Sequence, residues 1–268
     1  MTRKKAPSKT SSKHGLKIAG YALLLLIWVG ASVIASQFIV GRIMLLFIGA
    51  DKFVQPIPMA IYTACSYLLA LLLIVMVPIK LRKLWLDGHK DKKIKQEKVT
   101  IKCQDLGLKG WPTWTDIGLA PVGFIAYLIL AAVITAVFSL FPWFVADEAQ
   151  QLGFSVYSTG LDRVIAFLVL VVVAPVAEEI IFRGWLYGKL REMFHGEMPK
   201  QAGMLLAIFL TSLLFGIIHL QWNVGVNVFA LSVVLCGLRE ITGTIYAGIL
   251  LHMLKNGVAF YLLYVLGI

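Results

Sequence analysis

The sequence predicts an all-α polytopic membrane protein in which about seven transmembrane helices enclose a polar cavity inside the bilayer. Hydrophobic residues make up 59% of the 268 residues and charged residues only 15%, which is more apolar than a soluble domain normally is. Within this apolar background, Glu178 and Glu179 stand side by side near the inner end of an apolar run. An ionisable side chain at mid-bilayer costs about 2.5 to 3.5 kcal/mol on insertion scales, so the pair indicates a functional site.

Seven apolar stretches follow one another, and most reach the roughly 20 residues that a helix needs to cross the hydrocarbon core. They are approximately residues 16–40, 57–79, 115–141, 161–182, 201–220, 224–238 and 243–267. The first is long and lacks a clear cleavage site, so we expect it to remain as a signal anchor. We expect one integrated membrane domain. In it, residues 1–114 supply a basic tail, two helices and a basic loop, and residues 115–268 supply a helical core with the polar motifs.

The charge pattern predicts the orientation of the helices. The amino terminus carries basic residues and no acid, and the loop from Lys80 to Trp114 carries ten Lys and Arg against four acids, so both are expected to be cytoplasmic. The loop from Pro142 to Gly160 has two acids and no basic residue, which favours the outside. The net charge of +11 is then an orientation signal that also attracts anionic lipid heads. We therefore expect a multi-pass protein of a bacterial plasma membrane. No nucleic-acid partner is expected, because no aromatic-interleaved basic motif accompanies the charge.

The three cysteines, Cys65, Cys103 and Cys236, are scattered along the chain without a CxxC pair. Neither a disulfide framework nor a cysteine zinc site is indicated by this spacing. We expect them to be packing residues.

The fourth apolar stretch gives its two glutamates different positions. Helical residues four apart share a face, whereas immediate neighbours diverge by about 100°. Glu179 is therefore predicted to pair with Arg183, while Glu178 faces a cavity and Pro175 kinks the helix one turn earlier. A carboxylate in such a cavity suits a general base. The alternative is that both glutamates only anchor the helix end by snorkelling beside the basic residues that follow.

Two further motifs lie in later apolar stretches. His219 follows Phe215 by one turn, so the phenyl ring is expected to wall the pocket or orient the imidazole. His252 and Asn256 form another pair four residues apart, and two hydrogen-bonding groups on one face suit an oxyanion. The alternatives are a hydrogen-bonded packing histidine and an interhelical polar clasp, which is worth about 1 kcal/mol in membranes.

If the fifth helix crossed the whole membrane, His219 would lie near the outer surface, far from the glutamates near the inner end. The three side chains can share one site only if the turn after His219 lies within the membrane. The sixth stretch, 224–238, is short for a span at about 1.5 Å per residue. We therefore expect the polar turn at residues 221–223 to lie within the membrane, lining protein or a water-filled cavity. We also expect the fourth helix to continue past Arg183, which makes Glu178 deeper.

These residues resemble the motifs of the CPBP (Abi) intramembrane proteases, which include the type II CAAX prenyl proteases. Glu178, Glu179 and Arg183 match EExxxR, Phe215 and His219 match FxxxH, and the third motif, HxxxN, is matched as well. The resemblance covers about residues 161–268. It implies an intramembrane endopeptidase in which Glu178 activates water with help from His219. By the same resemblance His252 and Asn256 stabilise the oxyanion, while Glu179, Arg183 and Phe215 support the site.

The mechanism has two versions. Family members are described both as metalloproteases and as glutamate-dependent enzymes, and a zinc ion would take Glu178, His219 and His252 with one open position. We expect the metal-free version, because pairing of Glu179 with Arg183 removes one ligand and places a cation near the metal.

Other classes of function remain open at this stage. A transporter or proton-relay protein would also bury carboxylates and histidines, but no inverted repeat relates the two halves. A non-catalytic scaffold or immunity protein could use the same pocket to bind a membrane peptide or lipid. The expected partners are membrane lipids and a membrane-associated peptide or protein substrate, of CAAX type or another type.

Overall fold

The structure of the chain is a computed structural model, which describes residues 9–81, 102–146, 148 and 160–267, with side chains from residue 15 onward. Helices dominate this part of the chain, and no strand occurs among the described residues. The elements are α1 (Lys9–Ile48), α2 (Ala50–Phe53), α3 (Pro56–Leu71), η1 (Leu72–Met76), η2 (Cys103–Leu106), α6 (Trp114–Phe138), α7 (Gly160–Phe167), η3 (Leu168–Val173), α8 (Ala174–Glu178), η4 (Glu179–Leu186), α9 (Tyr187–Phe194), α10 (Lys200–Ile217), α11 (Trp222–Thr242), α12 (Tyr246–Phe260) and η5 (Tyr261–Leu266).

The prediction of an all-helical protein with seven membrane-spanning helices is confirmed for the described residues. Seven helical segments there are long and apolar enough to cross a membrane. They are Gly15–Ile48, Pro56–Leu81, Trp114–Phe138, Gly160–Phe194, Lys200–Ile217, Trp222–Thr242 and Tyr246–Leu266. The chain is therefore an integral, multi-pass membrane protein.

Two predicted boundaries have different outcomes. The fourth helix continues past Arg183 to Phe194, as predicted. The prediction of a short sixth helix over residues 224–238 was wrong, because α11 runs from Trp222 to Thr242. Its last turn contains Arg239, whose guanidinium donates to the carbonyl of Gly243 just beyond the helix end. A polar helix end with such a partner extends the helix beyond its apolar residues.

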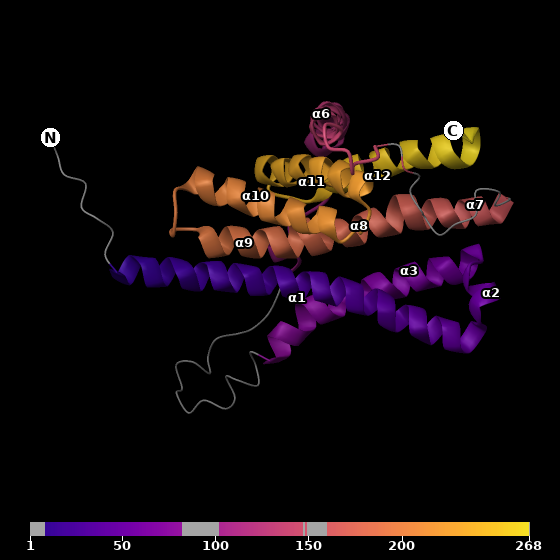
Figure 1. The fold of residues 1–268 in the computed structure, drawn as a ribbon, viewed down its shortest axis with the longest axis horizontal. Coiled ribbons are helices and arrows are strands. Elements are labelled where there is room, and N and C mark those ends of the chain that lie inside the picture. The colour runs from indigo at the N-terminus through magenta and orange to yellow at the C-terminus, as the bar shows by residue number, and fades with distance from the viewer. Residues whose placement is uncertain (1–8, 82–101, 147, 149–159, 268) are drawn as a thin grey trace.

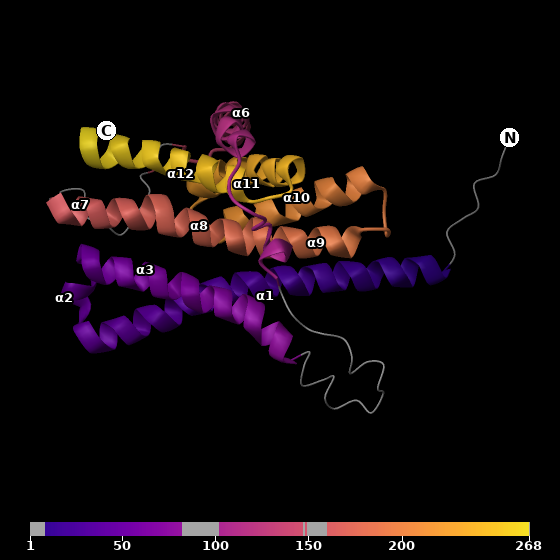
Figure 2. The same cartoon turned by 180° about the vertical axis from the view of Figure 1, so that it is seen from behind.

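The helices are arranged in layers around one long central helix. α7, η3, α8, η4 and α9 form this helix, with the pair α1 and α3 on one side and α10, α11 and α12 on the other (Figure 1). α6 packs on α11 and α12 and crosses the bundle steeply, since both views show it nearly end-on (Figure 2). The largest apolar core joins Val29 of α1, Ile74 of η1, Phe182 and Leu186 of η4 and Phe215 of α10. The amino-terminal helices are therefore packed on the motif-bearing ones.

The turn between α10 and α11 lies well inside the length of the bundle. α10 and α11 meet near the middle of the long axis, whereas α2, α7 and η5 reach its far end (Figure 1). Just after this turn, in the first turn of α11, the side chain of Asn223 donates to the carbonyls of Ala146 and Glu148, at 3.4 and 2.6 Å. Asn223 thus has partners in protein, and the predicted position of residues 221–223 within the membrane stays a prediction.

A close glycine contact fixes how α10 crosses α11. A Cβ added to Gly216 would lie 2.8 Å from the carbonyl oxygen of Gly225, and one added to Gly225 would lie 3.0 Å from that of Gly216. Small residues let helix backbones approach closely in membranes, where apolar contact with a partner has little advantage over contact with lipid. Because His219 follows Gly216 by three residues, this contact also determines where its ring lies.

Replacement of Gly216 by alanine should therefore destabilise the protein, by the roughly 1–3 kcal/mol typical of overpacking. Gly237→Ala on α11 is the matched control, because nothing lies within 4 Å of its added Cβ. There the better helix propensity of alanine should leave stability unchanged or slightly raised. Thermal unfolding in detergent compares the two variants, and equal midpoints would contradict the close contact.

Several predictions concern residues outside the described part of the chain. These are Arg3, Lys4 and Lys5 at the amino terminus, most of the basic loop between residues 80 and 114, and residues 149–159 of the acidic loop. The predicted orientation depends on those residues and stays a prediction. The cysteines are all free thiols, and only Cys236 is buried, so packing accounts for Cys236 but not for the exposed Cys65 and Cys103.

Candidate active site

The central helix is not a regular α-helix where it carries the motif. Its segments η3 and η4, on either side of α8, are π-helical, a geometry that often marks functional sites. In η3 the N–H of Ala174 bonds to the carbonyl of Val169, five residues earlier. The next bond of this pattern would join residue 175 to Leu170, but Pro175 has no N–H. The carbonyl of Leu170 is therefore left without its helical partner.

Asn256 of α12 supplies the missing donor. Its side-chain Nδ2 donates to the carbonyl oxygen of Leu170 at 2.9 Å. The contact ties α12 to the central helix two turns before Glu178. One of the two amide hydrogens of Asn256 is thus used in holding the helix, and the other is available to a ligand.

Glu179 is the centre of a fully buried polar network. Its Oε1 accepts from Nη1 of Arg183 at 2.9 Å and lies 3.0 Å from Nδ1 of His252. Both charged side chains are almost completely inaccessible to solvent. The Arg183 guanidinium also lies over the ring of Phe215, 4.4 Å from its centroid, which is a favourable cation–π contact. The predicted pairing of Glu179 with Arg183 is therefore present, and Phe215 is part of it.

Glycine makes room for this network on the opposing helix. A Cβ added to Gly248 of α12 would lie 3.1 Å from Oε2 of Glu179. Gly248 and His252 are four residues apart and so lie on the same face of α12. The face of α12 toward Glu179 is therefore shaped by a small residue in one turn and a hydrogen-bonding ring in the next.

Glu178 is directed to a different set of partners. Its Oε1 accepts a hydrogen bond from the hydroxyl of Tyr67 on α3. Its Oε2 lies 3.6 Å from Nε2 of His252, and the Glu178 side chain is 15% exposed. A separation of 3.6 Å is too long for a direct hydrogen bond. This oxygen is therefore free to contact a small molecule such as water.

In both histidines of the site, Nδ1 is engaged by an acceptor. Nδ1 of His219 lies 2.7 Å from the carbonyl oxygen of Phe215. A carbonyl can only accept, so Nδ1 carries the hydrogen and Nε2 of the neutral ring has a lone pair. Nδ1 of His252 is likewise engaged, by the Glu179 carboxylate.

His219 and His252 flank the same phenyl ring. The ring centroid of Phe215 lies 5.0 Å from that of His219 and 6.1 Å from that of His252. His219 also interacts electrostatically with Glu178 and His252. The structure therefore places Glu178 of the central helix 3.6 Å from His252 of α12, and His219, just beyond the end of α10, beside the Phe215 ring that His252 also contacts. Asn256 lies one turn of α12 beyond His252 and contacts Leu170.

Sequence reasoning missed two residues of this site. Tyr67 is one of several aromatic residues in an apolar span, and nothing in the sequence singles it out as the partner of Glu178. Lys255 interacts electrostatically with Glu178 and His219 and forms no ion pair within the described residues. Its position inside an apolar stretch, between His252 and Asn256, was a signal of the same kind as that of the glutamates.

Among the described residues, no group of three or more His, Cys, Asp and Glu side chains is arranged to hold a metal ion. Glu179 is paired with Arg183, as predicted, and this pairing places a cation beside the site. The metal-free mechanism stays a prediction.

These features define a class of protein: a polytopic helical membrane protein with a buried glutamate, histidine and arginine cluster. Residues 160–258 match the family described as type II CAAX prenyl endopeptidase, Rce1-like. The matched range contains every motif residue from Glu178 to Asn256, and the resemblance to the CPBP family is thereby confirmed. No curated protein and no solved structure matches the chain. The part of the chain that carries the motifs is thus similar to a family of CAAX-type endopeptidases.

The hydrogen bond from Asn256 to the carbonyl of Leu170 can be tested by mutation. Asn256→Ala leaves the Leu170 carbonyl unpaired, which should cost about 1–3 kcal/mol of unfolding free energy. Pro175→Ala restores an N–H at residue 175, so Asn256→Ala should cost less in that background. A double-mutant cycle in detergent measures the coupling, expected at about 0.5–3 kcal/mol.

Asn227 provides the control for this cycle. Its side-chain oxygen accepts from the hydroxyl of Tyr127 at 2.7 Å, away from Pro175. The cost of Asn227→Ala should therefore not depend on the residue at position 175. Strictly additive costs for Asn256→Ala and Pro175→Ala would show that the proline does not free the carbonyl that Asn256 occupies.

Proposed function

We propose that the protein is an intramembrane endopeptidase in which Glu178 activates the water that hydrolyses a peptide bond. One observation carries the proposal: a gap of 3.6 Å separates Oε2 of Glu178 from Nε2 of His252 in a largely buried site. A water molecule beside this pair, at a hydrogen-bond distance of about 2.8 Å from Oε2 of Glu178, would be within reach of the carboxylate while Nε2 of His252 faces the same space. General-base catalysis needs this geometry.

The reaction begins with Glu178. Its Oε2 takes a proton from the water, whose oxygen bonds to the scissile carbonyl carbon while the carbonyl electron pair moves onto oxygen. The hydrogen bond from Tyr67 to Oε1 holds the carboxylate so that Oε2 faces the water. The lone pair on Nε2 of His219 can accept the other hydrogen of the water and orient it. When the oxyanion collapses, the carbon–nitrogen bond breaks and the proton on Glu178 passes to the leaving amine.

His252 and Asn256 stabilise the developing oxyanion in this proposal. The Glu179 carboxylate holds Nδ1 of His252, which directs Nε2 toward the substrate, where a proton on Nε2 would reach the oxyanion. The amide hydrogen of Asn256 that is not used by Leu170 is a second donor. Donors held in place before the reaction are effective because they need no reorganisation as charge develops.

The substrate class is a peptide or protein associated with the membrane. The site is formed by spanning helices, and a CAAX-type substrate would reach it with a lipid chain lying against their exposed apolar faces. An unmodified transmembrane peptide fits the same description. Peptides released from membranes of active and Glu178-substituted cells, compared by mass spectrometry, would identify the physiological substrate.

The transporter and scaffold alternatives make a different prediction for the same residue. A scaffold needs the pocket but not a proton acceptor, so Glu178→Gln should keep its phenotype. A proton relay would lose proton movement with no peptide product at all. The described site favours hydrolysis, because its ionisable groups meet at one place instead of following a path.

Glu178→Gln should lower kcat for cleavage of a prenylated peptide by about 100- to 10,000-fold, the usual contribution of a general base. Glutamine keeps the hydrogen bond from Tyr67 but cannot take the proton. The control is Glu192→Gln on the same long helix, an exposed residue paired with Lys189. Undiminished cleavage by a folded Glu178→Gln variant would refute the proposed role.

Metal dependence is tested separately on purified protein. The donor geometry leads us to expect cleavage without stoichiometric zinc and no loss of activity with a chelator. Metal content is measured by mass spectrometry on the same sample that is assayed. Inhibition by the chelator, with rescue by zinc at one ion per chain, would replace the water-activation step with a metalloprotease mechanism.

A further inference from the structure

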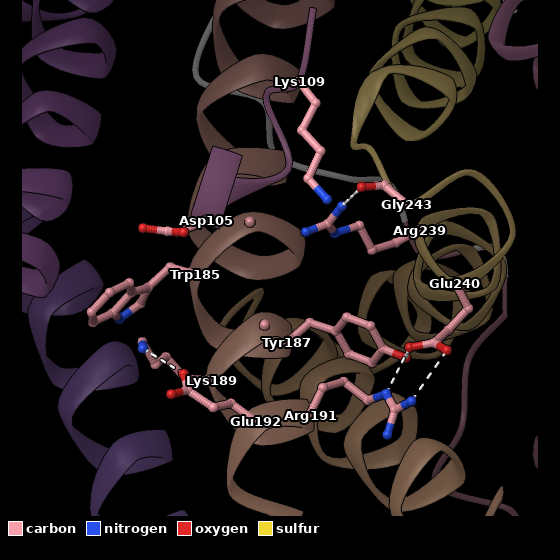
Figure 3. Close-up of a pocket in the computed structure, with 12 residues that line it drawn as sticks. Asp105, Lys109, Trp185, Tyr187, Lys189, Arg191, Glu192, Arg239, Glu240 and Gly243 are labelled. Atoms are coloured by element: carbon pink, nitrogen blue, oxygen red, sulfur yellow. Dashed lines mark hydrogen bonds and ion pairs between the residues drawn. The ribbon is translucent and has the colours of Figure 1, made fainter. Parts of the chain in front are cut away.

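A cavity lies away from the cluster of Glu178, His219 and His252, beside the ends of two spanning helices. It has a volume of about 630 Å³, and its lining comes from η4 and α9, from the end of α11 and from the segment that precedes α6 (Figure 3). Four basic side chains line it, Lys109, Lys189, Arg191 and Arg239, together with the acids Asp105, Glu192 and Glu240. The cavity is polar and opens to the surface, so it can admit a charged ligand.

The acids of this cavity are already engaged. Glu192 pairs with Lys189 at 2.6 Å, and Glu240 accepts from Arg191 at 2.6 and 3.3 Å. Glu240 also accepts from the hydroxyl of Tyr187 at 2.7 Å. Asp105 accepts from the backbone N–H of Lys102 at 2.8 Å, in the cap of its own short helix. Asp105 is thus bound by a backbone N–H and not by a cation, and its carboxylate points away from Lys109 (Figure 3). Four basic side chains against three acids leave the lining of the cavity with one excess positive charge.

Lys109 and Arg239 have no direct ion pair in the part of the chain that the structure describes, although Glu240 acts on Arg239 electrostatically. Arg239 donates a hydrogen bond to the carbonyl of Gly243. Figure 3 shows the ammonium of Lys109 directed toward the guanidinium of Arg239. Two like charges directed at one space repel each other unless an anion lies between them.

Arg239 is held in position by backbone rather than by an acid. Gly107 has φ +76°, and a Cβ there would lie 2.5–2.8 Å from the guanidinium atoms of Arg239. The carbonyl of Gly107 accepts from the N–H of Ile245 at 3.2 Å, which joins this segment to the start of α12. A side chain that the backbone fixes in this way needs little further ordering to bind a ligand.

The level of the cavity in the membrane indicates the source of the anion. Arg239 lies in the last turn of α11, and the spanning segment that contains α9 ends at Phe194. Trp111 and Trp114, close to Lys109 in the chain, are 89% and 87% exposed. Exposed tryptophans gather at the interface between membrane and water, where the phosphates of lipids lie. Basic pockets between helices at this level bind anionic head groups.

We infer that Lys109 and Arg239 bind the phosphate group of an anionic ligand, which the membrane supplies as the head group of an acidic phospholipid. The planar guanidinium can donate two parallel hydrogen bonds to phosphate oxygens, and the lysine adds a point charge. Neither residue takes part in the proposed hydrolysis, so this site is separate from the proposed function.

The test is native mass spectrometry of the purified full chain, supplied with micelles that contain phosphatidylglycerol or phosphatidylcholine. The wild type should retain one phosphatidylglycerol in preference to phosphatidylcholine. Lys109→Ala and Arg239→Gln should each weaken retention by about tenfold or more, since hydrogen bonds to charged groups contribute on that scale. The double replacement Lys189→Gln with Glu192→Gln is the matched control, because it removes an ion pair and leaves the net charge of the cavity unchanged, and retention should change less than about twofold.

Inorganic phosphate distinguishes the two sources of the ligand. If phosphate alone raises the unfolding temperature, and Lys109→Glu abolishes that rise, the site is supported with a soluble ligand as its occupant. Lys109 is exposed on a segment outside the spanning helices, so its variants should fold even if Arg239→Gln does not. Equal phosphatidylglycerol retention by the wild type and Lys109→Glu, with no effect of phosphate, would overturn the inference.

Discussion

The site depends on the buried ion pair between Glu179 and Arg183. Two charges without solvent are tolerated when they neutralise each other, and loss of one partner of such a pair costs about 3–5 kcal/mol. Among the described residues, Oε2 of Glu179 and Nε and Nη2 of Arg183 have no hydrogen-bond partner, so the pair depends on its mutual attraction and on His252 and Phe215. Here the pair also reaches two other helices. The carboxylate fixes Nδ1 of His252 on α12, and the guanidinium lies against Phe215 of α10, whose carbonyl holds His219. One interaction thus sets the relative positions of three motif-bearing helices.

Charge balance explains how Glu178 is accommodated beside this pair. Glu179 is neutralised by Arg183, and Glu178 interacts electrostatically with Lys255 while accepting a hydrogen bond from Tyr67. The second carboxylate therefore has a counter-charge without being bound to it directly, since Lys255 forms no ion pair among the described residues. A carboxylate compensated at a distance keeps an oxygen available for chemistry, whereas a directly paired one does not.

Contacts within one helix could be predicted from the sequence, whereas contacts between helices could not. The spacing of Glu179 and Arg183 is a property of one helix, so their pairing followed from the sequence. The helix count likewise followed from apolar length, because lipid imposes that length on each span. Tyr67 lies more than a hundred positions before Glu178, and only the packing of α3 on α8 brings them together. The length of α11 was misjudged because its polar end is stabilised by contacts with other segments.

Pro175 illustrates why a correct local prediction can still be incomplete. The sequence indicated a kink, but the helix responds with π-helical turns that widen its hydrogen-bond spacing. The proline then removes one specific donor, and the carbonyl that loses it is the one that Asn256 contacts. A buried carbonyl without a donor is costly in a membrane, where water cannot replace the lost partner. The motif residues on α12 and the irregular central helix are therefore parts of one arrangement. In it Asn256 donates to the carbonyl of Leu170, and His252 lies between the two glutamates. Both contacts together fix the position of the glutamates relative to α12.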